Sequence, residues 1–356
     1  MFKILDIYIG RTIVATTALT LSMLVGLSAI IKYVEQLRKV GDGTYDLIAA
    51  LWFVVLSIPR DIEMFFPMAV LLGALIGLGM LASSSELTVM QAAGVSKLQI
   101  GVSVLKTAVP LMLIIMALGE WGSPVTQKMA RELRAVATSG GNLLSVQNAV
   151  WAKDGNDFIY IARVNDDDSL RGVNIWEYDD SNTLQTSLYA ETADFDPVRG
   201  WYLYDVTSTE MQGEWRTKQE AEQQAWSTTL TPDKLAVVTV KPEELSMSGV
   251  YEYVRYLRES QQDASRYELA FWRKAVQPIS VAVMMLLALS FVFGPLRSVT
   301  MGARVLSGVV FGFGFYISNE VFGPMSIVYR LHPSFGALGP SVLFLFVTLY
   351  LLSRKL

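Results

Sequence analysis

The chain consists of two strongly apolar arms that flank one acidic, polar block. Residues 135–250 carry eight Lys and Arg against nineteen Asp and Glu, a net charge of −11, whereas the whole chain has a net charge of −4. The arms therefore carry +7. Hydrophobic residues make up 52% of the 356 positions, a high share for a soluble protein of this size. This pattern predicts a polytopic membrane protein that holds a folded polar module outside the bilayer.

Six segments are long and apolar enough to cross a bilayer, which takes about 20 helical residues each. They are 13–31, 65–81, 100–118, 276–293, 305–322 and 335–352. Leu47–Ile58 precedes the second segment, and Pro59 and Pro67 interrupt the apolar run. Because proline breaks helices, we expect residues 47–58 to form a short, separate helix at the membrane interface. Six crossings place both termini on one side. We expect the first segment to stay as a membrane helix, since no small-residue cleavage site follows it.

The polar block has the composition of β-strands. Residues 157–162, 172–178 and 201–206 are rich in aromatic and β-branched residues, and turn formers separate them. Strands at such short intervals predict an antiparallel sandwich or roll. Residues 217–225 are polar, and we expect a helical or loose excursion there. Phe158–Ile161 is apolar on both faces, which indicates either burial on two sides or an inner face open to an apolar ligand.

The expected organisation has three parts. Residues 1–134 hold three membrane helices with a short helix at about 83–95, residues 135–248 form the all-β domain, and residues 249–356 hold a linker helix and the last three membrane helices. The linker is predicted from the amphipathic pattern of residues 250–262.

Several classes of site are excluded by composition. The chain has no cysteine, which removes disulfides, thiolate zinc sites and cysteine nucleophiles. Its single histidine, His332, argues against a multi-histidine metal site. No Gly-Lys dipeptide occurs, so the chain lacks the phosphate-binding loop of P-loop ATPases. We therefore expect no metal and no cofactor in this chain, and any ATP-driven step requires a separate ATPase.

Six cations from three segments are expected at one level of the bilayer. They are Lys32, Arg38, Lys39, Arg60, Arg131 and Arg134. We expect few acids to match them, and Arg and Lys suit the phosphates of an anionic headgroup. The alternative is snorkelling and binding of ordinary anionic lipid, at about 1 kcal/mol per residue. Convergence of three segments favours a dedicated phosphate site.

The connection after the second span predicts a short helix. Serines precede Glu86, apolar Leu87 and Met90 follow, and Gly94 ends the run. A capped helix between two spans suits docking into a cleft on a cytoplasmic partner; the alternative is an ordinary connecting turn.

The distribution of charge alone does not determine which side of the membrane carries the polar block. Short loops on the side of the termini carry seven basic residues, against eleven on the side of the polar block. The positive-inside rule then places the polar block in the cytoplasm. The alternative is that the cations beside the block serve a function that overrides this bias.

Motifs along nearly the whole chain resemble the lipopolysaccharide export permease family, the LptF/LptG type of ABC transporter permease. They are Tyr8-Ile9-Gly10-Arg11-Thr12, Pro67 with Leu72-Gly73-Ala74-Leu75, Ser85–Gly94, Gly119-Glu120-Trp121 with Pro124, Leu230–Leu235, Gln277-Pro278 and Phe293-Gly294-Pro295-Leu296-Arg297-Ser298. The last run and the basic loop at Arg38-Lys39 favour the LptG branch over the LptF branch.

This resemblance implies a layout that reverses the simple charge count. It implies a multi-pass protein of the inner membrane of a Gram-negative bacterium, with cytoplasmic termini and a periplasmic β-jellyroll. The positions of the six cations are then those implicated in contacting lipid A phosphates; Arg38 and Arg60 stand where relatives commonly have Lys. Glu86 matches the acidic residue of the coupling helix that docks on the ATPase, together with Leu87, Met90 and Gly94.

The resemblance also implies a function and partners. The chain would be a non-catalytic permease subunit of a transporter that extracts lipopolysaccharide and passes it to a periplasmic bridge. Its partners would be an LptF-like permease subunit, an LptB-like ATPase dimer that binds ATP and Mg, and an LptC-like membrane-anchored periplasmic protein, with no nucleic acid. The alternative is a membrane-anchored periplasmic scaffold or binding protein without its own lipid path.

Overall fold

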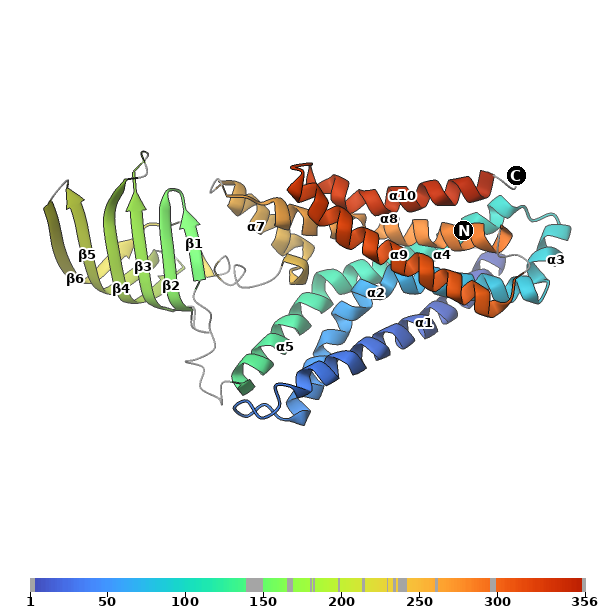
Figure 1. Cartoon of the computed structure of the whole chain (residues 1–356), viewed down its shortest axis with the longest axis horizontal. Coiled ribbons are helices and arrows are strands. Elements are labelled where there is room, and N and C mark those ends of the chain that lie inside the picture. Colours follow the sequence, from blue (N-terminus) through green and yellow to red (C-terminus); the bar gives the residue numbers. More distant parts are fainter. Residues whose placement is uncertain are drawn as a thin grey trace.

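A six-stranded sheet lies at one end of the molecule and a bundle of long helices at the other, with α7 between them (Figure 1). The computed structural model describes residues 4–138, 150–164, 169–179, 181, 183–197, 199–212, 215–228, 230–232, 235, 242–259, 262–294 and 299–353. Both chain ends and α3 lie at the end of the bundle remote from the sheet (Figure 1). In the described part, six helical spans are long and apolar enough to cross a membrane, as predicted.

The helical bundle is formed by the two arms of the chain. Its helices are α1 (Ile4–Leu37), α2 (Leu47–Ser83), α3 (Glu86–Ala92), α4 (Lys97–Ala117), the π-helix η1 (Leu118–Gly122), α5 (Ser123–Thr138), α8 (Ser265–Phe293), α9 (Met301–Val328) and α10 (Pro333–Ser353). Glycines allow close packing within this chain: the Thr16 hydroxyl donates to the Gly73 carbonyl at 2.7 Å, and a side chain at Gly308 would meet Leu72 and Leu75.

The predicted break in the second segment is wrong. Residues 47–83 form one continuous helix, α2, with Pro59 and Pro67 inside it. The Asp46 side chain starts this helix by accepting a hydrogen bond from the Ala49 amide at 2.7 Å. Proline is tolerated inside such helices when neighbouring helices pack around them. α2 packs against α1, α5, α8 and α9. These tertiary contacts therefore outweigh the local tendency of proline to break the helix.

Three helical stretches extend beyond any bilayer. α4, η1 and α5 run without interruption from Lys97 to Thr138, 42 residues. At 1.5 Å per residue this is about 63 Å, roughly twice the hydrocarbon thickness. α1 and α2, with 34 and 37 residues, are also longer than a simple crossing. Their extra length lies on the sheet side, where α1 and α5 end and α2 begins (Figure 1).

The inserted domain is all-β, as predicted. Its strands are β1 (Val150–Asp154), β2 (Asp157–Val164), β3 (Leu170–Tyr178), β4 (Leu184–Asp196), β5 (Gly200–Gln212) and β6 (Trp215–Trp226). Each strand pairs antiparallel with the next, in the order β1-β2-β3-β4-β5-β6. The implied jellyroll has two sheets, whereas the described strands form one sequential sheet.

The expected loose excursion at residues 217–225 is wrong, because these residues lie in strand β6. They pair with β5 in regular register, for example Thr207 with Glu220 and Thr209 with Lys218. β6 is an edge strand, and its residues 216–225 are exposed. An edge strand with water on both faces needs no alternation of apolar and polar residues, so the sequence pattern did not indicate a strand here.

The two faces of the sheet have different roles. On the inner face, Ile159 and Ile161 are 1% and 0% exposed, and they belong to a core that includes Leu230 and residues of α7 (Met247–Glu259). On the outer face, Trp151 stacks on Trp176 with ring centroids 5.5 Å apart. Phe158–Ile161 is thus apolar on both faces because one face is packed and the other carries aromatic side chains. The predicted amphipathic linker is confirmed as α7.

Candidate functional site

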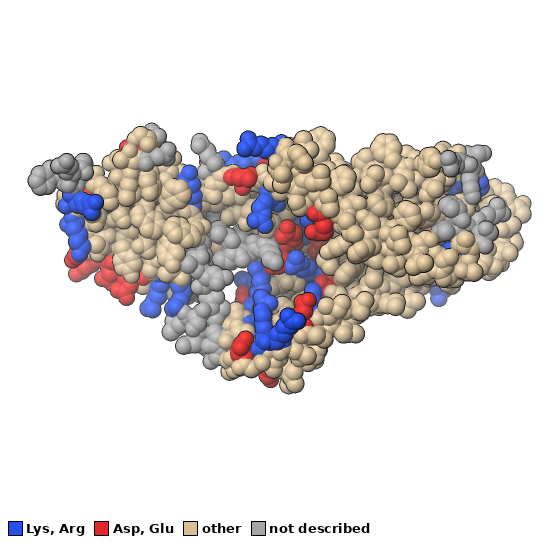
Figure 2. Space-filling model, in the orientation of Figure 1, with Lys and Arg blue, Asp and Glu red and all other residues tan. Residues whose placement is uncertain are grey.

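The six predicted cations come from elements that meet at the sheet-side end of the bundle. Lys32 lies near the end of α1, and Arg60 lies in α2. Arg38 is the first residue of the loop between these two helices. This loop is fastened to α5, because the Thr44 amide donates to the Ala137 carbonyl at 2.7 Å. In the view of Figure 2, basic and acidic side chains gather between the sheet and the bundle, whereas the surface of the bundle beyond them carries few charges.

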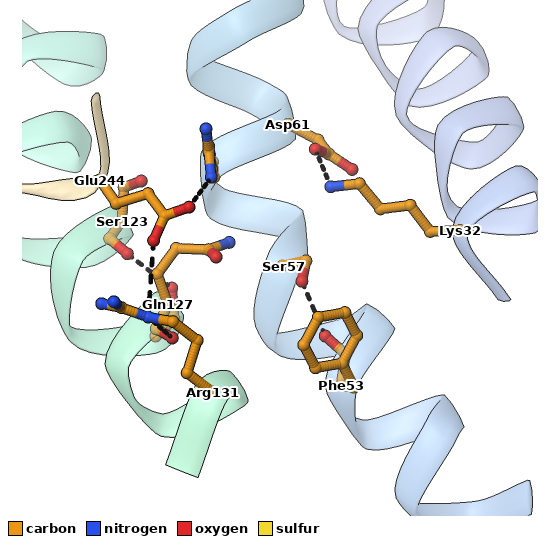
Figure 3. Close-up of polar contacts among 10 residues, drawn as sticks. Lys32, Phe53, Ser57, Asp61, Ser123, Gln127, Arg131 and Glu244 are labelled. Atoms are coloured by element: carbon orange, nitrogen blue, oxygen red, sulfur yellow. Dashed lines mark hydrogen bonds and ion pairs between the residues drawn. The ribbon is translucent and has the colours of Figure 1, made fainter. Parts of the chain in front are cut away.

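Lys32 is held by a buried carboxylate. Its ammonium pairs with Asp61 of α2, and the Asp61 side chain is 3% exposed (Figure 3). The Ser28 hydroxyl donates to the other Asp61 oxygen at 3.0 Å. The pair joins α1 to α2, and removal of Lys32 would leave the buried Asp61 carboxylate without its cation.

Arg60 and Arg131 share one carboxylate, that of Glu244. Arg60 Nη1 lies 2.5 Å from Glu244 Oε1, and Arg131 Nε lies 3.4 Å from Oε2. Arg131 Nε also donates to the Gln127 carbonyl at 3.3 Å (Figure 3). The Glu244 side chain is 9% exposed and each arginine 30%. Glu244 belongs to η3 (Pro242–Glu244), the turn that connects the β domain to α7.

The remaining three cations lie around the loop between α1 and α2. Arg134 stacks on Phe53 of α2, with its guanidinium carbon 4.8 Å from the ring centroid. Burial raises the pKa of the Tyr45 phenol, and the nearby positive charge of Arg134 opposes this rise. Arg38 and Lys39 are exposed, and the structure gives them no acidic partner in the part of the chain that it describes.

The expectation that few acids match the cations is therefore too simple. Asp61 and Glu244 neutralise part of the charge of Lys32, Arg60 and Arg131. Sequence reasoning missed Glu244 as a site residue, because it is 184 positions from Arg60 and no local pattern connects the two. Excess positive charge stays accessible at Arg38 and Lys39.

A second charged contact, also missed from the sequence, lies at the same junction. Lys274 Nζ pairs with Glu63 Oε1 at 2.8 Å, and their side chains are 11% and 13% exposed.

Glu120 of the π-helix accepts from the Met247 amide at 2.8 Å and from the Ser248 hydroxyl at 2.5 Å. Its carboxylate thus caps the first turn of α7, where free amides and the helix dipole favour negative charge. The family motif at 119–121 was the available signal for Glu120.

The residues predicted to form the coupling helix lie at the opposite end of the bundle. Glu86, at the start of α3, accepts from the Tyr8 hydroxyl at 2.7 Å and from the Ser84 hydroxyl at 2.9 Å. Leu87 is 3% exposed and lies in the bundle core, and Met90 packs against that core.

Gly94 follows α3 with φ +90°, a conformation that favours glycine. The large apolar side chain that α3 exposes is Val89, at 65%. Sequence reasoning did not single out Val89 as the exposed one. Among the described residues, no group of three or more His, Asp or Glu could hold a metal ion.

The fold and the charged residues at the sheet-side end define the class of protein. It is a six-span integral membrane protein with an extramembrane β domain and with cations where the two parts meet. The family model for the lipopolysaccharide export system permease LptF/LptG matches residues 7–354. The chain therefore belongs to the LptF/LptG family of lipopolysaccharide export permeases, as the sequence motifs predicted.

Individual relatives confirm the predicted branch. The chain is 52% identical to lipopolysaccharide export system permease protein LptG of Escherichia coli (strain K12), over 99% of both chains. It is also 52% identical to LptG of Haemophilus influenzae (strain ATCC 51907 / DSM 11121 / KW20 / Rd), over 100% of this chain and 99% of the relative. LptF of Escherichia coli (strain K12) is 27% identical over 37% of this chain and 40% of its own.

Proposed function

We propose that this chain is one permease subunit of a lipopolysaccharide exporter, and that the six cations bind the phosphates of lipid A. The observation that carries the proposal is the excess of positive charge, exposed at Arg38 and Lys39, directly beside apolar spans. Such a site matches an amphiphile with phosphorylated head and hydrocarbon tails. Family membership and the LptG relatives support the same substrate.

The tails set the main energetic requirement. A multi-acyl lipid holds dozens of methylenes, each costing about 0.8 kcal/mol if exposed to water. The total is tens of kcal/mol, so the tails must pass between apolar walls. α1 and α9 are the least covered spans, with 28% and 17% of their most apolar windows buried. We infer that an LptF-like subunit faces them and that the two subunits enclose the lipid.

The energy source lies outside this chain. In this proposal an LptB-like ATPase dimer binds ATP and Mg and contacts α3, whose movement closes the cavity between the permease subunits. Close packing of Leu87 in the bundle core would transmit a push on α3 to the membrane helices. The termini and α3 would be cytoplasmic, and the β domain would be periplasmic, where an LptC-like protein continues the path.

Charge reversal at the two exposed cations tests the proposal. Arg38→Asp with Lys39→Asp should abolish crosslinking of lipopolysaccharide to the purified complex while the complex still assembles. Arg216→Asp with Lys218→Asp on exposed strand β6 makes the same charge change away from the cluster and serves as the control. Unaltered crosslinking in the first variant would refute the phosphate role. A scaffold without a lipid path would behave in that way.

A further inference from the structure

A carboxylate of this chain occupies the space between two of the cations assigned to lipid phosphate. Glu244 comes from η3, between the β domain and α7, whereas Arg60 and Arg131 come from α2 and α5. It pairs with both, at 2.5 and 3.4 Å, and is 9% exposed. An acid buried at this position needs the two arginines as partners.

A phosphate presents oxygens to a guanidinium in the same way as a carboxylate does. It also carries more negative charge than a carboxylate at neutral pH. Each arginine keeps 30% of its side chain exposed, and the contact of Arg131 with Glu244, from Nε to Oε2 at 3.4 Å, is longer than the 2.5 Å contact of Arg60. The arginines are thus reachable from outside while Glu244 is bound.

We propose that Glu244 is an internal occupant of the lipid phosphate site, and that an arriving phosphate displaces it and releases residues 242–246 from the bundle. This inference rests on the proposed function. Two anions cannot share the same pair of guanidinium groups without strong repulsion, and a phosphate binds these groups through more oxygens. A carboxylate that has lost its cations is costly to bury, so Glu244 has to move into water.

The released segment has a fixed point at its far end. Glu120 holds the first turn of α7 through the Met247 amide and the Ser248 hydroxyl, and none of these contacts involves an arginine. Movement would therefore stop before α7. Because this segment lies between the β domain and α7 in the chain, phosphate occupancy in the bundle would be communicated to that domain.

Amide hydrogen exchange of the intact complex tests this displacement. Adding lipopolysaccharide should speed exchange in a peptide covering residues 242–250 on the order of tenfold, the loss of about one charged hydrogen bond. Most ligands slow exchange where they bind, so acceleration is a distinctive result. Unchanged or slower exchange in this peptide, with lipid bound, would overturn the proposal.

Glu244→Gln separates this inference from the proposed function. It should raise the apparent affinity for lipopolysaccharide about tenfold, because the site no longer carries a competing charge. The 242–250 peptide should exchange quickly even without lipid. Glu243→Gln removes the same charge from the exposed neighbouring residue and should behave as the wild type.

The outcomes differ for the two claims. Equal affinity in the Glu244→Gln and Glu243→Gln variants, while Arg38→Asp with Lys39→Asp still abolishes binding, would overturn the displacement and leave the phosphate site standing. Binding that survives the Arg38 and Lys39 reversal would refute the phosphate role of the cations, on which this inference rests. Copurification of the partner subunits verifies that each variant is assembled.

Discussion

The two ends of the helical bundle use charge in different ways. At the sheet-side end, side chains from distant segments form ion pairs, and two cations, Arg38 and Lys39, stay exposed beside them. At the α3 end, Asp6 accepts from Ser103 and Lys106 at 2.5 and 2.7 Å.

Arg304 at this α3 end is 3% exposed and donates to the Gly79 carbonyl at 2.7 Å. Lys106 and Arg304 therefore hold helices together at this end. The sheet-side end retains charge that a ligand can reach.

In the proposed function, this difference would allow one chain to bind an anionic lipid and also to transmit force. A binding site needs groups whose partners can be exchanged, which exposed or partly exposed cations provide. An element that transmits force needs contacts that stay intact when it is pushed, such as the packing of Leu87 in the core. The predictions below test this division, beginning with the largest expected effect.

Lys274→Ala tests whether every ion pair at the sheet-side end is exchangeable. The Lys274–Glu63 pair is almost fully buried, so removal of one partner should destabilise the protein by about 3–5 kcal/mol. Thermal unfolding of the purified complex measures this loss. Lys274→Met combined with Glu63→Leu should recover most of the stability, because no buried charge is left. A single variant as stable as the wild type would show that the pair is not structural.

Leu87→Ala tests the rigid character of the α3 end. Truncation of this core side chain should cost about 3 kcal/mol through lost burial and a cavity. Val89→Ala, on the exposed side of the same helix, should leave the unfolding temperature nearly unchanged and weaken binding of the ATPase. Stability measurements paired with ATPase copurification separate the two roles. Equal stability losses at both positions would contradict this orientation of α3.

Tyr8→Phe removes a single contact between α1 and α3. The Tyr8 hydroxyl donates to Glu86 in a solvent-exposed contact, so loss of this hydrogen bond should lower the stability only slightly. ATP hydrolysis should become less tightly coupled to lipid release. Glu86→Lys should have a stronger effect and uncouple or detach the ATPase. Normal ATP-driven release by the Glu86→Lys variant would exclude docking at this position.

Asp179→Asn provides a comparison in the β domain, where a carboxylate acts locally. Hydrogen bonds from the Ser181 side chain and the Thr183 amide lower the pKa of Asp179. The ionised carboxylate of Asp179 therefore stabilises the fold at pH values above its unfolded-state pKa of about 4. This contribution is lost as the pH falls through the lower folded-state pKa. The variant should loosen the turn slightly at neutral pH, and the difference should vanish in acid. Hydrogen exchange at Thr183 measures it.

The sequence predicted those features that depend on local composition. The six spans, the strands at 157–162, 172–178 and 201–206, and the linker helix all followed from hydrophobic length or residue type. The continuous α2 did not, because packing around Pro59 and Pro67 overrides their local preference.

Long-range partners were the features that local patterns could not supply. The six cations were predicted, but their individual environments were not. Glu244 reaches Arg60 across 184 positions, and no local pattern singled out Asp61 as the partner of Lys32. The inward direction of Leu87 likewise depends on how α3 packs on the bundle.

The most direct test of the phosphate site is a structure of the assembled complex with lipopolysaccharide bound. We predict lipid A phosphates within hydrogen-bonding distance of Arg38 and Lys39, at the sheet-side end, with acyl chains against the apolar spans. Phosphates located at the α3 end, or bound lipid that leaves all six cations without a phosphate contact, would contradict the account.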